Sequence, residues 1–323
     1  MILRRSRFWI SLIFFVLVVL PFLLPLPAQP DKSADALLPA GGRFVTVAGL
    51  RTVLMEVGSA GQPAVVLLHG FGGSTFSWRY TLPALQAAGF HAIAFDLKGF
   101  GLSNKTFNTD YGHAAQADFV ADVMTAAGIE HATLVGHSLG GSVIAHFAMR
   151  HAQRADRLVF VDAAILDRAQ TPTLLQRVVP LLLTLQPAQR WGQLVLRSFI
   201  TPQRTAAIAR SAYHNPARLT PEVERAYLAP QTLRGWDLAL LGILRDALRS
   251  TLPAALQSIS VPALVIWGEH DNWIPLAAGA HLRDMLPAAA WAVVPDAGHL
   301  PMEEQPAAFN KILLDFLATS PRR

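Results

Sequence analysis

A serine stands between two glycines in Gly136-His137-Ser138-Leu139-Gly140, after the run Thr133-Leu134-Val135, which is typical of a buried strand. A helical pattern follows and continues to about His151. A strand, a sharp glycine-flanked turn and a helix form the context in which a serine hydroxyl is presented as a nucleophile. Glycines suit this turn because larger side chains would collide with the adjoining strand and helix. Unpaired N–H groups at the helix start also favour developing negative charge, although a glycine-rich helix start without chemistry is the alternative interpretation.

Two further residues supply the base and the acid that an attacking serine needs. His299 follows the apolar run Val293-Val294, and Asp271 follows the run Ile266-Trp267. The chain order serine, acid, histidine is one of three orders in which a Ser-His-Asp triad occurs. Asp162 also ends a strand-like run and remains the rival acid.

Strand-like runs alternate with helical patterns through most of the chain, after an opening β-hairpin within residues 44–57. The runs after the hairpin are 65–68, 92–96, 133–135, 158–162, 263–267 and 291–294. Continuous apolar runs are typical of parallel strands covered on both faces, and their alternation with helices predicts a doubly wound parallel sheet. Ligands bind beyond the carboxyl ends of such strands. We therefore expect Ser138, Asp271 and His299 at one edge of the sheet.

Residues 166–252 interrupt this alternation. No strand-like run occurs there, and the segment is helix-like, proline-punctuated and rich in leucine, as in Leu181-Leu182-Leu183. An insertion between two strands of one sheet predicts a helical cap over the carboxyl edge. Residues 43–165 and 253–319 then form the α/β core.

Residues 1–29 contain an uncharged apolar stretch from Phe8 to Leu26, preceded by three arginines. Its length approaches that needed to span a bilayer, and the arginines should stay cytoplasmic. We therefore expect a transmembrane anchor that places the catalytic domain on the non-cytoplasmic side. The alternative is a signal sequence, cut at the poor processing site Leu26-Pro27-Ala28 to give a secreted protein. Residues 30–42 are typical of a linker.

Composition narrows the function classes. Five arginines near the chain ends account for the net charge of +5, and the other 22 basic side chains balance 22 acidic ones. A nucleic-acid surface is therefore not expected. The absence of cysteine excludes disulfides and thiolate chemistry. Because neither a metal-site motif nor a dinucleotide fingerprint occurs, we expect no metal and no cofactor.

Four motifs occur in a characteristic order: HGFGGS at 69–74, GHSLGG at 136–141, GEHDNWIP at 268–275 and DAGHLP at 296–301. With them the sequence resembles the α/β-hydrolase superfamily over about residues 44–317, apart from the variable cap. The resemblance implies a serine-nucleophile, capped, esterase- or lipase-like member with the catalytic residues Ser138, Asp271 and His299. The backbone N–H groups of Phe71 and Leu139 would then form the oxyanion hole.

Three further polar residues near these motifs are interpreted as structural. We expect His69 to shape the oxyanion loop and His137 to pack inside the serine turn. Asp96, at the end of a predicted strand, is expected to stabilise the loop that follows it.

The reaction that the resemblance implies is hydrolysis of a carboxylic ester through an acyl-enzyme, with His299 as the base. Relatives that open epoxides or remove halides use an aspartate nucleophile, so Ser138 disfavours those activities despite Tyr213 and Tyr227 in the cap. The apolar cap and the anchor suggest a lipid-derived small molecule such as a monoacylglycerol. Alternatives are carbon–carbon hydrolysis of vinylogous diketones, suggested by residues 267–275, haloperoxidase or perhydrolase activity, and a non-catalytic binding protein.

Overall fold

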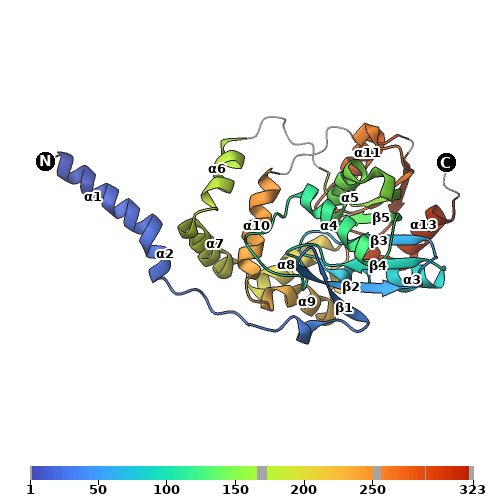
Figure 1. Cartoon of the computed structure of the whole chain (residues 1–323), viewed down its shortest axis with the longest axis horizontal. Coiled ribbons are helices and arrows are strands. Elements are labelled where there is room, and N and C mark those ends of the chain that lie inside the picture. Colours follow the sequence, from blue (N-terminus) through green and yellow to red (C-terminus); the bar gives the residue numbers. More distant parts are fainter. Residues whose placement is uncertain (1, 166–172, 250–255, 288, 320–323) are drawn as a thin grey trace.

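An eight-stranded sheet forms the centre of the protein (Figure 1). The structure is a computed structural model that describes residues 2–165, 173–249, 256–287 and 289–319. The strands are β1 (Gly42–Val47), β2 (Leu50–Val57), β3 (Ala64–Leu68), β4 (His91–Phe95), β5 (Ala132–His137), β6 (Ala155–Val161), β7 (Ala263–Gly268) and β8 (Ala290–Val294).

The strands lie in the order β1-β2-β4-β3-β5-β6-β7-β8. β1 and β2 form an antiparallel hairpin, β2 pairs antiparallel with β4, and the strands from β3 to β8 run parallel. The hairpin turns at Ala48 and Gly49, which both have positive φ. Two such residues match the right-handed twist of the flanking strands. The arrangement confirms the predicted, mostly parallel, doubly wound sheet.

Alternate side chains along the central strands enter two apolar cores, one on each face of the sheet. In β3, Val66 and Leu68 belong to one core, whereas Val65 and Leu67 belong to the other. Burial on both faces explains why these strands are continuously apolar in the sequence. The helices of this part of the chain are α3 (Thr81–Ala87), α4 (His113–Ala126), α5 (Leu139–Arg150), α11 (Leu276–Met285), α12 (Pro301–Glu304) and α13 (Pro306–Ala318). α4, α5 and α11 cover the core that contains Val66, and α3 and α13 cover the core that contains Val65.

A group of helices lies between β6 and β7 along the chain, as the predicted cap requires (Figure 1). They are α6 (Leu174–Leu182), α7 (Gln186–Phe199), α8 (Pro202–Ala212), α9 (Pro221–Leu228) and α10 (Trp236–Arg249). Ala209 and Val223 join α8 and α9 to one core, and Ile243 joins α10 to the other. The predicted cap boundaries at 166 and 252 lie outside the described residues.

The N-terminal segment is helical and projects from the cap side of the domain (Figure 1). It comprises α1 (Ile2–Phe14), a wide π-type turn over Phe15–Val19, and α2 (Leu20–Leu23). The wide turn precedes Pro21, which has no N–H to offer the carbonyl four residues before it. Residues 6–23 are long and apolar enough to cross a membrane, and a signal sequence has the same properties.

The chain that follows this helix runs along the cap before it enters β1. The Arg234 guanidinium lies 2.8 Å from the Asp31 carboxylate. The N–H of Lys32 donates to the carbonyl oxygen of Thr232 at 2.9 Å. The first residues of the predicted linker are therefore bonded to the cap.

Candidate active site

Ser138 is the single residue between the end of β5 and the start of α5. Its backbone has φ 50° and ψ −114°, a conformation that residues other than glycine rarely adopt. The Ser138 N–H donates to the carbonyl oxygen of Val161, and its own carbonyl accepts from the N–H groups of Gly141 and Ala164, each at 2.9 Å. These three bonds fix the strained turn that was predicted for the serine.

The flanking glycines are required by crowding. A methyl group on Gly136 would lie 2.3 Å from the carbonyl oxygen of Gly140. One on Gly140 would lie 2.5 Å from the carbonyl oxygen of Leu68. Both obstacles are backbone atoms, which cannot move aside as a flexible side chain can, so only glycine fits either position.

The loop after β3 approaches the serine closely. A methyl group on Gly70 would lie only 2.9 Å from Ser138 Cβ. Within the described part of the chain, the N–H groups of Phe71 and Leu139 donate no hydrogen bond, so both stay available to an acceptor. The Leu139 N–H is at the first position of α5, where the helix itself offers it no partner.

Two buried side chains brace the loops around this turn. His69 bonds through Nδ1 to the carbonyl oxygen of Gly70 at 2.7 Å, and its Nε2 accepts from the N–H of Leu97 at 3.0 Å. Asp96 accepts from the N–H of Thr75 at 2.8 Å. Burial lowers the pKa of His69 and raises the pKa of Asp96. These contacts agree with the structural interpretation of both residues.

His299 and Asp271 are bonded to each other. His299 Nδ1 lies 2.7 Å from Asp271 Oδ2, and both side chains are buried. Asp271 Oδ1 accepts from the N–H groups of Trp273 and Ile274, at 2.8 and 3.0 Å. Burial opposes ionisation of Asp271, but the hydrogen bond and charge of His299 outweigh it and lower the pKa of Asp271. With Nδ1 committed to Asp271, Nε2 is the ring nitrogen left to act as a base.

Ser138 and His299 line one cavity, together with Gly70 and Phe71. No hydrogen bond joins the Ser138 hydroxyl to His299 among the residues that the structure describes. Contacts of this kind often tighten only when substrate binds. The Leu139 side chain packs against the core, so this residue meets the site through its backbone. All the site residues predicted from the sequence therefore lie just beyond the carboxyl ends of strands, at one edge of the sheet.

Three contacts that sequence reasoning missed hold the His299 segment in place. His137 Nε2 donates to the carbonyl oxygen of His299 at 2.7 Å. The Trp273 ring stacks on the His299 imidazole, with ring centroids 5.1 Å apart. The His299 N–H donates to the carbonyl oxygen of Ala212 in the cap at 2.8 Å. Burial, and then the proximity of His299, lower the pKa of His137 to about 3, so His137 acts as a neutral donor.

Asp162, the rival acid, lies behind the pair. It is fully buried, has φ 42°, and accepts from the Gly268 N–H at 2.9 Å through Oδ1, whereas its Oδ2 meets no donor among the described residues. Asp162, Asp271 and His299 each place one side-chain oxygen or nitrogen atom within 4.8 Å of the other two. Burial, and then the charge of Asp271, raise the pKa of Asp162 well above its usual value. The charged form is therefore disfavoured at Asp162 and favoured at Asp271.

Asp162→Asn is expected to stabilise the protein at neutral and alkaline pH. When the folded-state pKa of an acid is raised, its stabilising contribution is full below the unfolded-state pKa and is lost as pH rises, because the unfolded chain ionises first. Asparagine keeps an acceptor for Gly268 without that loss. In detergent, the apparent Tm of the variant should exceed that of the native chain by at least about 2 °C at pH 8. The two values should converge near pH 4, and a difference independent of pH would contradict a raised pKa of Asp162.

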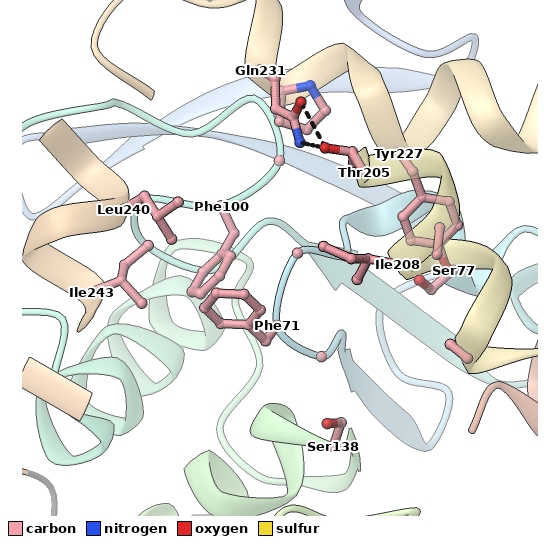
Figure 2. A pocket seen from close by; sticks show the side chains of 18 of the residues that line it. Phe71, Ser77, Phe100, Ser138, Thr205, Ile208, Tyr227, Gln231, Leu240 and Ile243 are labelled. Carbon is pink, nitrogen blue, oxygen red and sulfur yellow. Dashed lines mark hydrogen bonds between the residues drawn. The ribbon is translucent and has the colours of Figure 1, made fainter. Parts of the chain in front are cut away.

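The cavity above Ser138 has a volume of about 220 Å³ and a mainly apolar lining (Figure 2). The side chains labelled around it include Phe71, Phe100, Leu240 and Ile243 on one side, and Ile208 and Tyr227 on the other. Phe71 and Phe100 meet edge to face, with centroids 5.7 Å apart. An apolar cavity with a few polar groups at one end is typical of a small-molecule binding site.

The cap tyrosines direct their hydroxyl groups to a buried carboxylate, Glu303. Tyr213 and Tyr227 donate to Glu303 at 2.8 and 2.7 Å, and Arg79 donates to it at 2.7 Å. Burial, and then the charge of Glu303, raise the pKa of both tyrosines. Both hydroxyls are thus protonated donors whose partner is Glu303.

A second group with metal-ligating atoms lies outside the cavity. His214, His270 and Asp296 are exposed and each offers an atom within 4.8 Å of the others. The rings of His214 and His270 stack with centroids 4.0 Å apart. The stacking of the two imidazole rings accounts for their closeness without a bound metal ion.

A comparison with known families agrees with the fold: a family model described as the alpha/beta hydrolase fold matches residues 63–306. The protein belongs to the α/β-hydrolase family. The resemblance seen in the four motifs is therefore confirmed. Relatives of this α/β-hydrolase are named as hydrolases, which supports its assignment as an enzyme of this class.

Relatives with different named reactions resemble this α/β-hydrolase to a similar degree. Epoxide hydrolase 3 of Xenopus tropicalis is 29% identical over 302 residues, which are 89% of this chain and 82% of that protein. The 2-hydroxy-6-oxo-6-phenylhexa-2,4-dienoate hydrolase of Burkholderia cepacia is 28% identical over 288 residues, which are 85% of this chain and 96% of that protein. The crystal structure of a membrane phospholipase A shares the fold, with a TM-score of 0.70 and 23% identity over 98% of this chain and 96% of that one.

Proposed function

We propose that this α/β-hydrolase cleaves carboxylic esters with Ser138, His299 and Asp271 as its catalytic residues. One observation carries the proposal. His299 is bonded to buried Asp271 at 2.7 Å and lines the same cavity as Ser138, whose backbone is strained. We further propose the domain organisation expected from the sequence, with the cap over the core.

In the proposed reaction His299 Nε2 takes the proton from Ser138 as the serine oxygen attacks the ester carbonyl. Asp271 stabilises the imidazolium and keeps its orientation. The oxyanion accepts from the Phe71 and Leu139 N–H groups, which no other acceptor occupies in the described chain. His299 then protonates the departing alcohol and activates the water that hydrolyses the acyl-enzyme.

The cavity supports a substrate with one apolar acyl group. Its volume of about 220 Å³ is below the range of about 300–1,000 Å³ that is common for small-molecule pockets. Its lining is mainly apolar, with the serine at one end. A monoacyl ester fits this shape better than a lipid with two acyl chains.

Two named activities of relatives compete with ester hydrolysis. Carbon–carbon hydrolysis is the second candidate, because the relative from Burkholderia cepacia is 28% identical over most of both chains. Epoxide opening is disfavoured, because position 138 is serine and the hydroxyls of Tyr213 and Tyr227 bond to Glu303.

A substrate panel distinguishes these reactions. The native chain in detergent should hydrolyse p-nitrophenyl esters with a preference for medium acyl chains, and should cleave monoacylglycerols. A vinylogous diketone and an aryl epoxide serve as competing substrates. Faster turnover of the diketone than of every ester would replace the ester proposal with carbon–carbon hydrolysis.

Gly70→Ala is expected to lower kcat on the preferred ester about a hundredfold. The added methyl would lie 2.7 Å from His137 Nδ1 and 2.9 Å from Ser138 Cβ, so the loop that carries the Phe71 N–H must move away. KM should change much less than kcat, because the donor acts on charge that develops in the transition state. Unchanged kcat in steady-state kinetics would argue against Phe71 as an oxyanion donor.

We also propose that residues 6–23 stay attached as a membrane anchor, with the catalytic domain on the non-cytoplasmic side. The Arg190 side chain donates to the carbonyl oxygens of Pro21 and Leu24, at 3.1 and 3.0 Å, and so caps the end of this helix. These bonds give the segment a place in the folded enzyme, which a removed signal sequence does not need. Mass spectrometry of membrane-extracted protein should find the intact N-terminus. A chain that begins near Ala28 would support secretion instead.

A further inference from the structure

Large apolar side chains stay exposed along two neighbouring cap helices, α6 and α7. We call this set the α6–α7 face; its members are Leu174, Val178, Leu181, Leu182, Leu185, Val195 and Phe199. Leu174 is 78% exposed and Leu181 is 61% exposed. Exposed apolar side chains in this number on two consecutive helices exceed the scattered single ones of an ordinary soluble surface, so they mark a place that contacts another apolar phase or partner.

The N-terminal helix determines where this face lies relative to a membrane. The last turns of the apolar segment, residues 15–23, pack against α7, and Pro21 is buried there. The Arg190 bonds to Pro21 and Leu24 join the same two elements. Because residues 6–23 are the candidate membrane span, α7 lies at the level where the span leaves the bilayer. In Figure 1, α6 and α7 lie near this end of the helix, whereas the sheet lies farther away.

The charge of the same part of the cap suits an anionic lipid surface. Between Thr173 and Pro221 the chain has six arginines and no aspartate or glutamate. Arg197 pairs with Asp237 and Arg210 with Glu224, both elsewhere in the cap, so this segment keeps an excess of basic charge. Basic side chains next to an apolar helix face are the usual composition of helices that lie in the membrane interface. This basic charge favours an anionic lipid surface as the occupant over a protein surface that has few acidic side chains.

The face is continuous with the cavity. Phe199, at the end of α7, is 60% exposed, and the next residue, Ile200, lines the cavity. Ile208 of α8 is 57% exposed and also lines the cavity. The Arg204 guanidinium lies over the Phe199 ring, 5.0 Å from its centroid, so an acyl chain that moves along this surface passes one cationic side chain before it reaches the cavity wall.

We propose that the α6–α7 face rests in the headgroup and upper acyl region of the bilayer that holds the anchor, and that a monoacyl ester enters the cavity from the lipid past Phe199 and Ile208. The location of the face rests on the proposed anchor. The route of entry rests also on the proposed ester hydrolysis, so the two parts need separate measurements.

The first measurement locates the face without any turnover. The chain has no cysteine, so Leu181→Cys and the control Met149→Cys, at an exposed residue of α5, each accept one bimane label. Both full-length variants are reconstituted in vesicles of phosphatidylcholine and phosphatidylglycerol. Doxyl-labelled lipid should quench the label at 181 at least about threefold more strongly than the label at 149. Equal quenching overturns the proposal, and so does a label at 181 that neither doxyl lipid nor aqueous iodide reaches, because a second protein copy would then cover the face.

The second measurement tests the route of entry. Leu181→Glu/Leu185→Glu in the full chain should lower kcat/KM at least about tenfold for a long-chain monoacylglycerol embedded in vesicles. Hydrolysis of a soluble short-chain ester in the same vesicles should stay within about twofold, because neither side chain lines the cavity. Equal kcat/KM values for the native chain and the variant on the embedded ester overturn the entry route. If the native chain cleaves neither ester, the proposed function fails, while the quenching result still decides where the face lies.

Discussion

Ser138→Ala should lower kcat on the preferred ester by a factor on the order of 10⁵ to 10⁶ and abolish labelling by a fluorophosphonate probe. The variant lacks the oxygen that attacks the carbonyl, whereas the cavity and the backbone donors remain. A small residual rate above that of water is therefore expected. The measurements are steady-state kinetics and gel fluorescence after labelling.

A second serine in the same turn provides the matched control. Ser142 is also buried and donates to the carbonyl oxygen of Ala164 at 2.7 Å, within the backbone that supports Ser138. Ser142→Ala should keep probe labelling, so loss of labelling in Ser138→Ala alone identifies the nucleophile. Labelling that survives in Ser138→Ala would place the reactive group elsewhere.

Asp271→Asn should lower kcat by about 10⁴-fold, because an amide at this position favours the wrong tautomer of the base. Asp271 Oδ2 accepts from His299, and its Oδ1 accepts from two backbone N–H groups, so the asparagine NH₂ would face one donor or the other. The imidazole would then present a proton to Ser138 instead of a lone pair.

Asp162→Asn is the paired variant that decides between the two acids. Asp162 bonds to Gly268 rather than to the imidazole, and burial raises its pKa, so this change should lower kcat less than about tenfold. A reversed ranking in kcat, with Asp162→Asn the more damaging variant, would make Asp162 the catalytic acid. The pH dependence of kcat/KM checks the result, since only loss of the true acid should shift the acidic limb of the profile, which reports the catalytic base.

Much of the fold is predictable because its signals are local. β3, β5 and β7 are continuous apolar runs, and burial on both faces of one sheet makes them so. The turn at Ser138 is predictable because crowding at Gly136 and Gly140 admits only glycine. The position of the N-terminal segment on α7 is not predictable, since side-chain to carbonyl bonds such as those of Arg190 leave no periodic pattern.

The choice between Asp162 and Asp271 also exceeds what the sequence provides. Both residues follow strands at the same edge of the sheet, and β6 and β7 are neighbours, so both carboxyl groups approach His299. Orientation separates them: Asp271 is turned to the imidazole by Trp273 and Ile274, whereas Asp162 is turned to Gly268. An acid at the end of a strand can be named as a candidate from the sequence. The conformation of the loop decides which acid bonds to His299.

Glu303 has a consequence for how the enzyme can open. Lifting α8 and α9 from the core would separate Tyr213 and Tyr227 from a carboxylate with no exposed side-chain surface, and each lost hydrogen bond to a charged group costs about 1.5–3 kcal/mol. That half of the cap is therefore held against the loop that carries His299. In the opposite half of the cap, Arg197 and Gln193 of α7 bond to the buried carboxylate of Asp237, but Asp237 belongs to α10, which is itself a cap helix. Movement of α7 together with α10 would keep these bonds, so reactants and products can enter and leave on that side.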